Sequence, residues 1–350
     1  MDNPTHSRSP HEAPTSELMP QPTAMRSRRA ARWLTVSLAV VGLAATVSTF
    51  VWSRIAVAVA PEKQAASRRS AHALAADELF WSTFHGGDYQ GIAAVLERET
   101  AAYLETPNDA LTAAHVGWLH VWRAAERARL ASPRATVTDD VVLGRKYFDT
   151  AVTLDPSEAR FRGFLATQLL SEAHIDKDER VTREGYYVLK RAIADWPEFN
   201  LFTAGYIMSD LPIDSVRFKE GLEQQWQNMD VCAGEHIDRS HPEYEKFLPL
   251  ATKTGKKRAC WNSWIAPHNL EGFFLNMGDM LVRTGDVATA RAIYANAEAA
   301  REYPTWKFKD VLEARIARAD ANVAAFNHPD ASSPRIMLRS EFACMACHQE

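Results

Sequence analysis

Apolar positions along most of the chain recur at helical spacing. Ala, Leu, Arg and Glu are frequent at intervals of three and four residues, and alternating runs of β-branched residues are few. Helices with an apolar face of this kind need other helices to cover it. The pattern therefore predicts an all-α fold, with the globular part at 79–330.

One stretch is apolar on all its faces. The twenty positions from Trp33 to Trp52 carry no charge, which is enough to cross about 30 Å of hydrocarbon as a helix. A tryptophan at each end suits the two membrane interfaces. We expect a transmembrane anchor at 33–53 that stays uncleaved. Because Ala58-Val59-Ala60 resembles a signal-peptidase site, a cleaved signal peptide with its cut after Ala60 is the alternative.

The remaining segments differ in composition. Residues 1–25 are rich in Pro, Ser and Thr and predict a disordered tail. Residues 62–78 predict a linker helix. Residues 211–269 break the helical pattern and read as an irregular insertion. This insertion holds Cys232 and Cys260, which are expected to form a disulfide in an oxidising compartment or else to remain as two buried thiols.

An internal period runs through the helical part. The spacing Gly-x-x-x-Phe-x-x-Ala-x-x-x-x-Pro occurs as Gly144, Phe148, Ala151 and Pro156, then as Gly185, Leu189, Ala192 and Pro197, and again as Ala290, Tyr294, Ala297 and the displaced Pro304. Gly285-Asp286 and Gly87-Asp88 predict the turns between paired helices. These residues resemble the tetratricopeptide repeat, which implies a TPR-like α-solenoid that binds peptides or proteins along a groove.

The net charge and the remaining polar residues argue against some kinds of partner and site. The formal net charge is −4, and no basic stripe is present, so we expect no nucleic-acid partner. The neighbouring Asp139 and Asp140 lie in an apparent loop and are expected to be solvated. His115, Trp118 and Trp122 share one helical face, which is more typical of packing between helices than of a cofactor pocket.

The end of the given sequence carries the most specific motif, Cys344-Met345-Ala346-Cys347-His348. Two thiols at this spacing match the two vinyl groups of a porphyrin, and the adjacent histidine can supply the proximal ligand to the iron. The five residues resemble the attachment site of c-type cytochromes. The resemblance implies haem c bound by Cys344, Cys347 and His348, in a compartment outside the cytoplasm.

Two other interpretations of the same motif remain open. The Cys-x-x-Cys pair can be a redox dithiol, although no strand precedes it as in thioredoxin-like proteins. It can also be half of a zinc site, with Cys232 and Cys260 as the other half.

A six-coordinate iron needs a second ligand, and His268 is the first candidate. His268 precedes the best repeat and follows an aromatic cluster, Trp261 to Trp264. The apolar segment 334–338 is expected to lie back on that repeat, which would bring the 331–350 haem-binding segment toward His268. Bis-histidine coordination by His348 and His268 is the prediction. The weaker candidates are Met277, Met280, Met208 and His174.

These expectations combine into one function and one alternative. The first is a mono-haem c-type cytochrome, anchored by a single span in a bacterial inner membrane with its C-terminal part in the periplasm. It would carry electrons to or from a protein partner and need not be an enzyme. The alternative is an envelope scaffold for protein–protein interaction, in which the cysteines are structural or bind metal.

Overall fold

The computed structural model describes residues 23–132 and 135–350, with side chains from residue 32 onward. Within these residues all regular elements are α-helices and short 3-10 helices, so the predicted all-α fold is confirmed. The chain forms two units, residues 1–62 and residues 63–350. Most of the predicted disordered tail, residues 1–22, lies outside the described residues.

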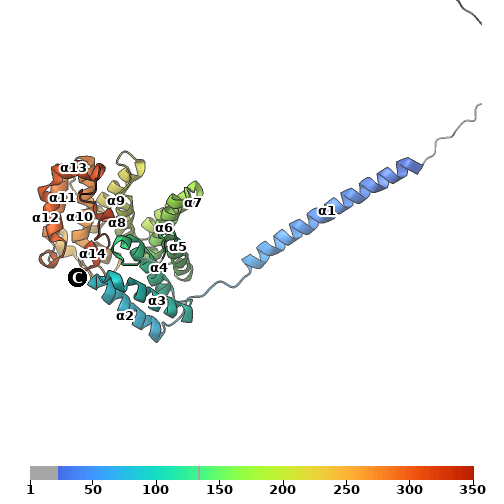
Figure 1. The fold of residues 1–350 in the computed structure, drawn as a ribbon, viewed down its shortest axis with the longest axis horizontal. Coiled ribbons are helices and arrows are strands. Elements are labelled where there is room, and N and C mark those ends of the chain that lie inside the picture. Colours follow the sequence, from blue (N-terminus) through green and yellow to red (C-terminus); the bar gives the residue numbers. More distant parts are fainter. Residues whose placement is uncertain (1–22, 133–134) are drawn as a thin grey trace, which may run out of the picture. The chain divides into compact units, whose positions relative to one another are not determined.

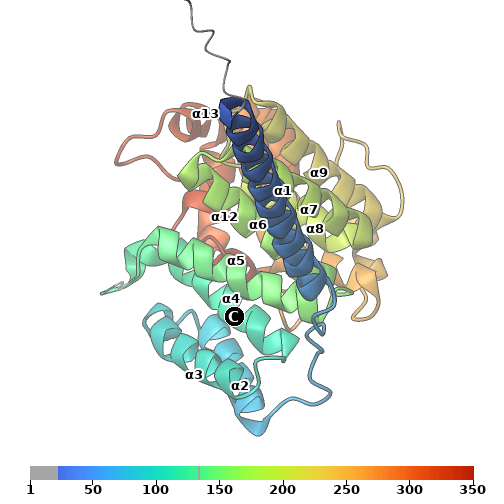
Figure 2. The same cartoon turned by 90° about the vertical axis from the view of Figure 1, so that its right-hand side faces the viewer.

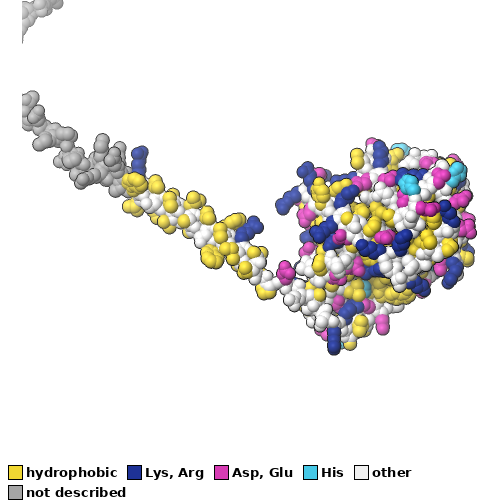
Figure 3. Space-filling model, turned by 180° about the vertical axis from the view of Figure 1, so that it is seen from behind, with side chains coloured by type: hydrophobic (Ala, Val, Ile, Leu, Met, Phe, Trp, Pro, Cys, Tyr) yellow, Lys and Arg dark blue, Asp and Glu magenta, His cyan; other side chains and the backbone are white. Residues whose placement is uncertain are grey.

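Helix α1, Thr23–Ala58, is a candidate membrane span. Its 27 residues from Arg32 to Ala58 are long and apolar enough to cross a membrane, and none of the span is buried. Figure 3 shows hydrophobic side chains along this helix. Thr46 and Thr49 donate to the carbonyls of Gly42 and Ala45 at 3.0 and 2.8 Å. The hydroxyls are thus satisfied within the helix, as a hydrocarbon environment requires.

In the second unit, helices adjacent in sequence pack side by side as pairs (Figure 1). The pairs are α2–α3, α4–α5, α6–α7, α8–α9 and α10–α11, and Figure 2 shows α2 beside α3 at one edge of the unit. The helices are α2 Ala71–Gly86, α3 Ile92–Glu105, α4 Ala110–Ala125, α5 Val137–Leu154, α6 Ala159–Asp176, α7 Glu179–Asp195, α8 Pro197–Met208, α9 Val216–Ala233, α10 Asn269–Thr284 and α11 Val287–Glu298.

The internal period explains how the pairs pack. Gly278 on α10 faces Tyr294 on α11 so closely that a Cβ at this glycine would collide with the tyrosine ring. Between α4 and α5, a Cβ at Gly117 would lie 3.0 Å from the ring of Phe148. Phe148 and Tyr294 are both fully buried. A small residue on one helix therefore admits a large one from its partner, and the large residues, Phe148 and Tyr294, belong to the internal period.

The predicted turns lie at helix ends. Gly285 ends α10 with a φ of 85°, and the Asp286 carboxylate accepts from the Thr289 N–H at 3.2 Å to cap α11. Gly87 ends α2 with a φ of 63°. At its other end α2 begins at Ala71, so it coincides with the predicted 62–78 linker helix over residues 71–78.

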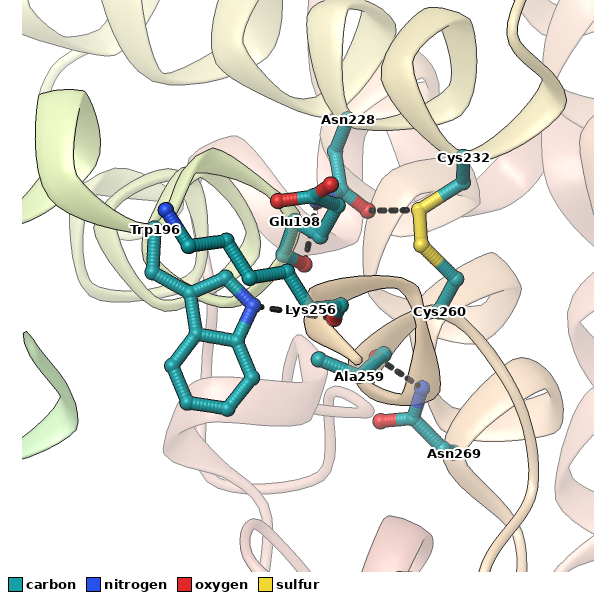
Figure 4. The surroundings of a disulfide bond; sticks show 8 residues. All are labelled: Trp196, Glu198, Asn228, Cys232, Lys256, Ala259, Cys260 and Asn269. Atoms are coloured by element: carbon teal, nitrogen blue, oxygen red, sulfur yellow. Dashed lines mark hydrogen bonds between the residues drawn. A yellow bond between two sulfur atoms is a disulfide. The ribbon is translucent and has the colours of Figure 1, made fainter. Parts of the chain in front are cut away.

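A disulfide holds the segment that interrupts the helical pattern against α9 (Figure 4). The predicted 211–269 insertion contains α9 and then the 3-10 helices η3, Glu245–Leu250, and η4, Lys256–Cys260. Cys232 on α9 is bonded to Cys260, which confirms the expected disulfide. The Trp196 indole donates to the Lys256 carbonyl at 2.9 Å. Residues 234–268 are thus clamped to α8 and α9.

The chain after α11 returns to α10. First comes the 3-10 helix η5, Tyr303–Thr305, which is followed by the helices α12, Lys309–Ala317, and α13, Ala319–Asn327. Two short elements come last, η6, Met337–Arg339, and α14, Met345–His348. Asp279 on α10 accepts from the Tyr294 hydroxyl at 2.7 Å, from Arg315 at 3.1 Å and from the Met337 N–H at 2.7 Å. These bonds hold the segment before α14 on α10, as expected for residues 334–338.

Candidate functional site

The Cys-x-x-Cys-His motif forms the turn that begins at Cys344 and continues as α14. Met345 is fully buried in the apolar cluster of α2, α3 and α4, which includes Phe80 and Trp122. Ala346 and Cys347 belong instead to the cluster built around α10. Helix α14 therefore lies between the first helices of the unit and α10, with one apolar residue packed on each side.

Hydrogen bonds to the backbone hold α14 in this place. The Trp306 indole donates to the Ala346 carbonyl at 2.8 Å, and the His268 N–H donates to the Cys347 carbonyl at 3.0 Å. On the other side, the Glu350 N–H donates to the His85 carbonyl at 3.0 Å. A Cβ at Gly272 of α10 would collide with the Cys347 sulfur, so this glycine permits the close approach.

His348 has the form that metal ligation requires. Its Nδ1 lies 2.8 Å from the Ile265 carbonyl, which places a proton on Nδ1 and leaves the Nε2 lone pair available. Burial lowers the pKa of His348 to about 4, with the Ile265 carbonyl acting against the shift and His85 adding to it. The imidazole is therefore neutral at pH 7. A metal-bound histidine usually donates a hydrogen bond from its other ring nitrogen, and a backbone carbonyl is one of the usual acceptors.

The two thiols are free and protonated. Cys344 and Cys347 are not bonded to each other, whereas the other two cysteines of the chain are. Burial, together with the nearby Glu126 carboxyl, raises the pKa of Cys344 to about 12. Burial, Cys344 and Glu271 raise the pKa of Cys347.

This chemistry weakens both alternatives to haem. A reactive dithiol has a lowered pKa and an electropositive surrounding, and these thiols have the opposite. The zinc interpretation that used Cys232 and Cys260 is wrong, because those two sulfurs are bonded to each other.

Polar groups without hydrogen-bond partners surround the thiols. Within the described residues, the Trp122 indole N–H, both carboxylate oxygens of Glu126 and the Tyr206 hydroxyl are buried and make no hydrogen bond. Burial raises the pKa of Tyr206, and the thiols of Cys344 and Cys347 and the Glu126 carboxyl raise it further, so these groups lie near one another. Trp122 contacts Phe84, whose ring lies 4.9 Å from that of His348.

Unpartnered buried polar groups are costly unless something else satisfies them. The motif supplies two free thiols and an imidazole with an available Nε2, which are the groups that a covalently attached haem would use. The Trp122 indole N–H and the Tyr206 hydroxyl can donate to the carboxylate side chains of a porphyrin, whereas an ionised Glu126 cannot.

His268, the predicted second ligand, is next to the motif. It is buried, its N–H bonds to the Cys347 carbonyl, and its Nδ1 lies 3.1 Å from the Glu271 carboxylate. The Asn262 amide holds the other oxygen of Glu271 at 2.9 Å. The structure thus brings His268 to the haem-binding segment, and its role as a ligand stays a prediction.

Sequence reasoning missed several residues of the site. His85 is buried and bonds, like His348, to the Ile265 carbonyl, at 3.4 Å. Glu126 and Tyr206 come from α4's C-terminal end and from α8, far from the motif in sequence. No local spacing links these residues to Cys344, so only the tertiary fold identifies them.

Comparison with known proteins adds no assignment: no family model, no curated protein and no solved structure matches this chain.

Proposed function

We propose that this protein is a membrane-anchored mono-haem c-type cytochrome that exchanges electrons with a protein partner. In this proposal Cys344 and Cys347 carry haem c, and His348 is its axial ligand. The observation that carries the proposal is the neutral His348 imidazole, held through Nδ1 by the Ile265 carbonyl beside two free thiols. A TPR-like scaffold of paired helices holds the motif in place.

When bound, haem supplies one-electron redox chemistry. The chain's own residues attach, orient and shield it. The two thiols fix its position, and the Ile265 carbonyl fixes the rotation of the His348 ring. Phe84 and Trp122 provide an apolar surface that excludes water. In this proposal the protein is an electron carrier, which need not be an enzyme.

Two features support a location outside the cytoplasm. The candidate span of α1 would anchor the chain in an inner membrane. The Cys232–Cys260 disulfide lies in the second unit and is typical of an oxidising compartment such as the periplasm. A single span with the helical unit in the periplasm satisfies both features.

Haem attachment is tested by cysteine replacement in the full chain, expressed with a c-type maturation system. The wild type should stain for haem on a denaturing gel and gain the mass of one haem. Cys344→Ser with Cys347→Ser should lose both signals. Cys232→Ser with Cys260→Ser is the matched control, since it removes the same number of sulfurs and should keep the haem.

The proposal fails if the wild type carries no haem, or if the Cys344/Cys347 variant still does. A haem-free wild type would leave the interaction scaffold as the better account. In that case the cysteines of α14 would only pack against Gly272 and the neighbouring apolar cluster.

The second ligand is tested separately on the haem-loaded protein. We propose bis-histidine coordination by His348 and His268, because the His268 backbone is bonded to the motif itself. His268→Ala should change a low-spin spectrum to a high-spin one that binds carbon monoxide, with the covalent haem retained. His72→Ala, at an exposed position on α2, is the control. An unchanged low-spin spectrum would assign the ligand to another residue.

A further inference from the structure

A second cluster of possible ligands lies on α2, α3 and α4. Asp77, Glu99 and His115 each offer one possible ligand atom, and these three atoms lie within 4.8 Å of one another. His115 Nδ1 lies 2.7 Å from an Asp77 oxygen and 3.1 Å from a Glu99 oxygen. Glu99 and His115 are almost completely buried, at 0 and 1 % exposure, while Asp77 is partly exposed.

The charges of this cluster do not balance. Asp77, Glu99 and the buried Asp109 contribute three carboxylates. Arg69 is their cation: its Nη2 donates to Asp77 at 2.9 Å and its Nε to Asp109 at 2.8 Å. With a neutral His115, two negative charges remain without compensation. Burial acts to lower the pKa of His115, but Asp77 and Glu99 raise it, and a protonated His115 still leaves one negative charge. Burying uncompensated charge is strongly unfavourable.

Glu99 gives a second, independent indication. One of its carboxylate oxygens accepts from His115, and the other, Oε2, is buried without any hydrogen-bond partner among the described residues. A carboxylate that is fully removed from water normally satisfies both oxygens. This oxygen belongs to the same carboxylate that faces Asp77 and His115.

A neighbouring cluster on α4 and α5 shows the contrast. His120 Nδ1 lies 2.9 Å from Asp140, and the Arg123 guanidinium donates to the same carboxylate at 2.8 Å. One carboxylate and one guanidinium balance there. One oxygen of Asp140 is buried without a hydrogen-bond partner in the described part of the chain, like that of Glu99, so the two clusters differ in their balance of carboxylates and cations.

We propose that Asp77, Glu99 and His115 bind a divalent cation of the zinc class. An imidazole nitrogen and carboxylate oxygens are ordinary zinc ligands, and two positive charges balance the cluster. Water completes the coordination through the partly exposed side at Asp77. The cation ties three helices together behind Phe80, whose ring stacks on His115 at 4.5 Å. The proposal is independent of haem.

The site is tested by metal content and by stability of the full chain in detergent. The protein is stripped with EDTA, reloaded with Zn²⁺ alone, desalted and analysed for bound zinc. His115→Gln and Glu99→Gln should each lose one equivalent relative to the wild type. His120→Gln is the matched control and should retain it. Haem absorbance of the same samples reports separately on Cys344 and Cys347. In a second series, each variant is made in a Cys344→Ser/Cys347→Ser background, which removes zinc bound by free thiols.

A second measurement does not depend on the variants folding. Zn²⁺ added to the stripped wild type should raise the midpoint of thermal unfolding, because a ligand that binds only the folded state stabilises it. The rise should be absent in any folded His115→Gln or Glu99→Gln protein. A wild type that holds no zinc after reloading, or equal zinc in the wild type and His115→Gln, would overturn the proposal. Protons on both His115 and Glu99 would then balance the charge.

Discussion

Glu126 is a carboxyl group to which none of the described residues donates a hydrogen bond. It is 1 % exposed, and its closest cation is Arg129 at 3.8 Å. Burial raises the pKa of Glu126 to about 7, with Arg129 opposing the shift and Glu341 adding to it. Cys344, Tyr89 and Tyr206 are the other titratable groups that face it. Glu126 therefore changes charge near neutral pH, beside the motif.

The shift has a defined effect on stability. Because the folded-state pKa of Glu126 is raised, the folded protein holds this proton more tightly than the unfolded chain does. The protonated Glu126 therefore stabilises the folded state relative to the ionised form. This contribution to the free energy of unfolding is fully present below about pH 4.5 and is lost as the pH rises through about 7. We expect Glu126→Gln to unfold like the wild type near the lower pH and to be more stable by roughly 2 to 3 kcal/mol near pH 8.

Urea unfolding followed by circular dichroism at several pH values checks this prediction. Glu97→Gln, which replaces an exposed carboxyl on α3, should show no such divergence. Parallel pH curves for Glu126→Gln and the wild type would contradict the assignment.

Gly272 is the closest contact between α10 and the motif. Gly272→Ala places a methyl group against the Cys347 sulfur and forces α14 away from α10. We expect a loss of roughly 1 to 3 kcal/mol in unfolding free energy, as for overpacked cores. Gly86→Ala, where a Cβ meets nothing within 4 Å, should have little effect. Thermal unfolding of both variants measures the difference, and equal midpoints would mean that α14 is not held against α10.

At the scale of elements, the disulfide cross-links α9 to the segment that follows it. It closes a separation of 28 residues, which stabilises the folded state by roughly 3 to 4 kcal/mol in the chain-entropy treatment. Cys232→Ser with Cys260→Ser should lose about this amount in urea unfolding, and reducing agent should produce the same loss in the wild type. A change below about 1 kcal/mol would show that the packing of Trp196 and Asn269 holds the segment without the bond.

The helices were largely predictable from sequence, because their apolar period records which face is buried. Phe148, Leu189 and Tyr294 are buried where the repeat pattern requires. The pattern failed for Asp140, which is fully buried on His120 and Arg123 although its neighbour Asp139 is exposed and caps α5. Helix α5 begins at Val137, so the two aspartates point in different directions.

The site was predictable only where its residues are contiguous. The motif identified Cys344, Cys347 and His348, and the apolar segment before it indicated the approach to His268. Ile265 and Glu126 depend on how α14 lies between distant helices, which no local pattern records. Their roles follow from contacts between residues far apart in the chain.

At the scale of the whole molecule, the candidate span of α1 would decide where the helical unit resides. Arg32–Ala58 is long and apolar enough to cross a membrane, and none of it is buried. We expect the protein to remain in membranes through salt and carbonate washes and to keep its N-terminal residues. Removal of residues 1–61 behind a cleavable signal should release a soluble, mainly helical domain. A mature N-terminus near Pro61 would contradict an uncleaved anchor.

If haem is attached outside the cytoplasm as proposed, the position of α14 would set an order of events in maturation. Helices α2 and α10 precede α14 in the chain and would leave an exporter first. With α14 docked between them, Cys347 is 5 % exposed and its sulfur lies on Gly272. An attachment enzyme would need accessible sulfurs and so would have to act after export and before docking. Premature docking would then trap a folded protein that can no longer receive haem.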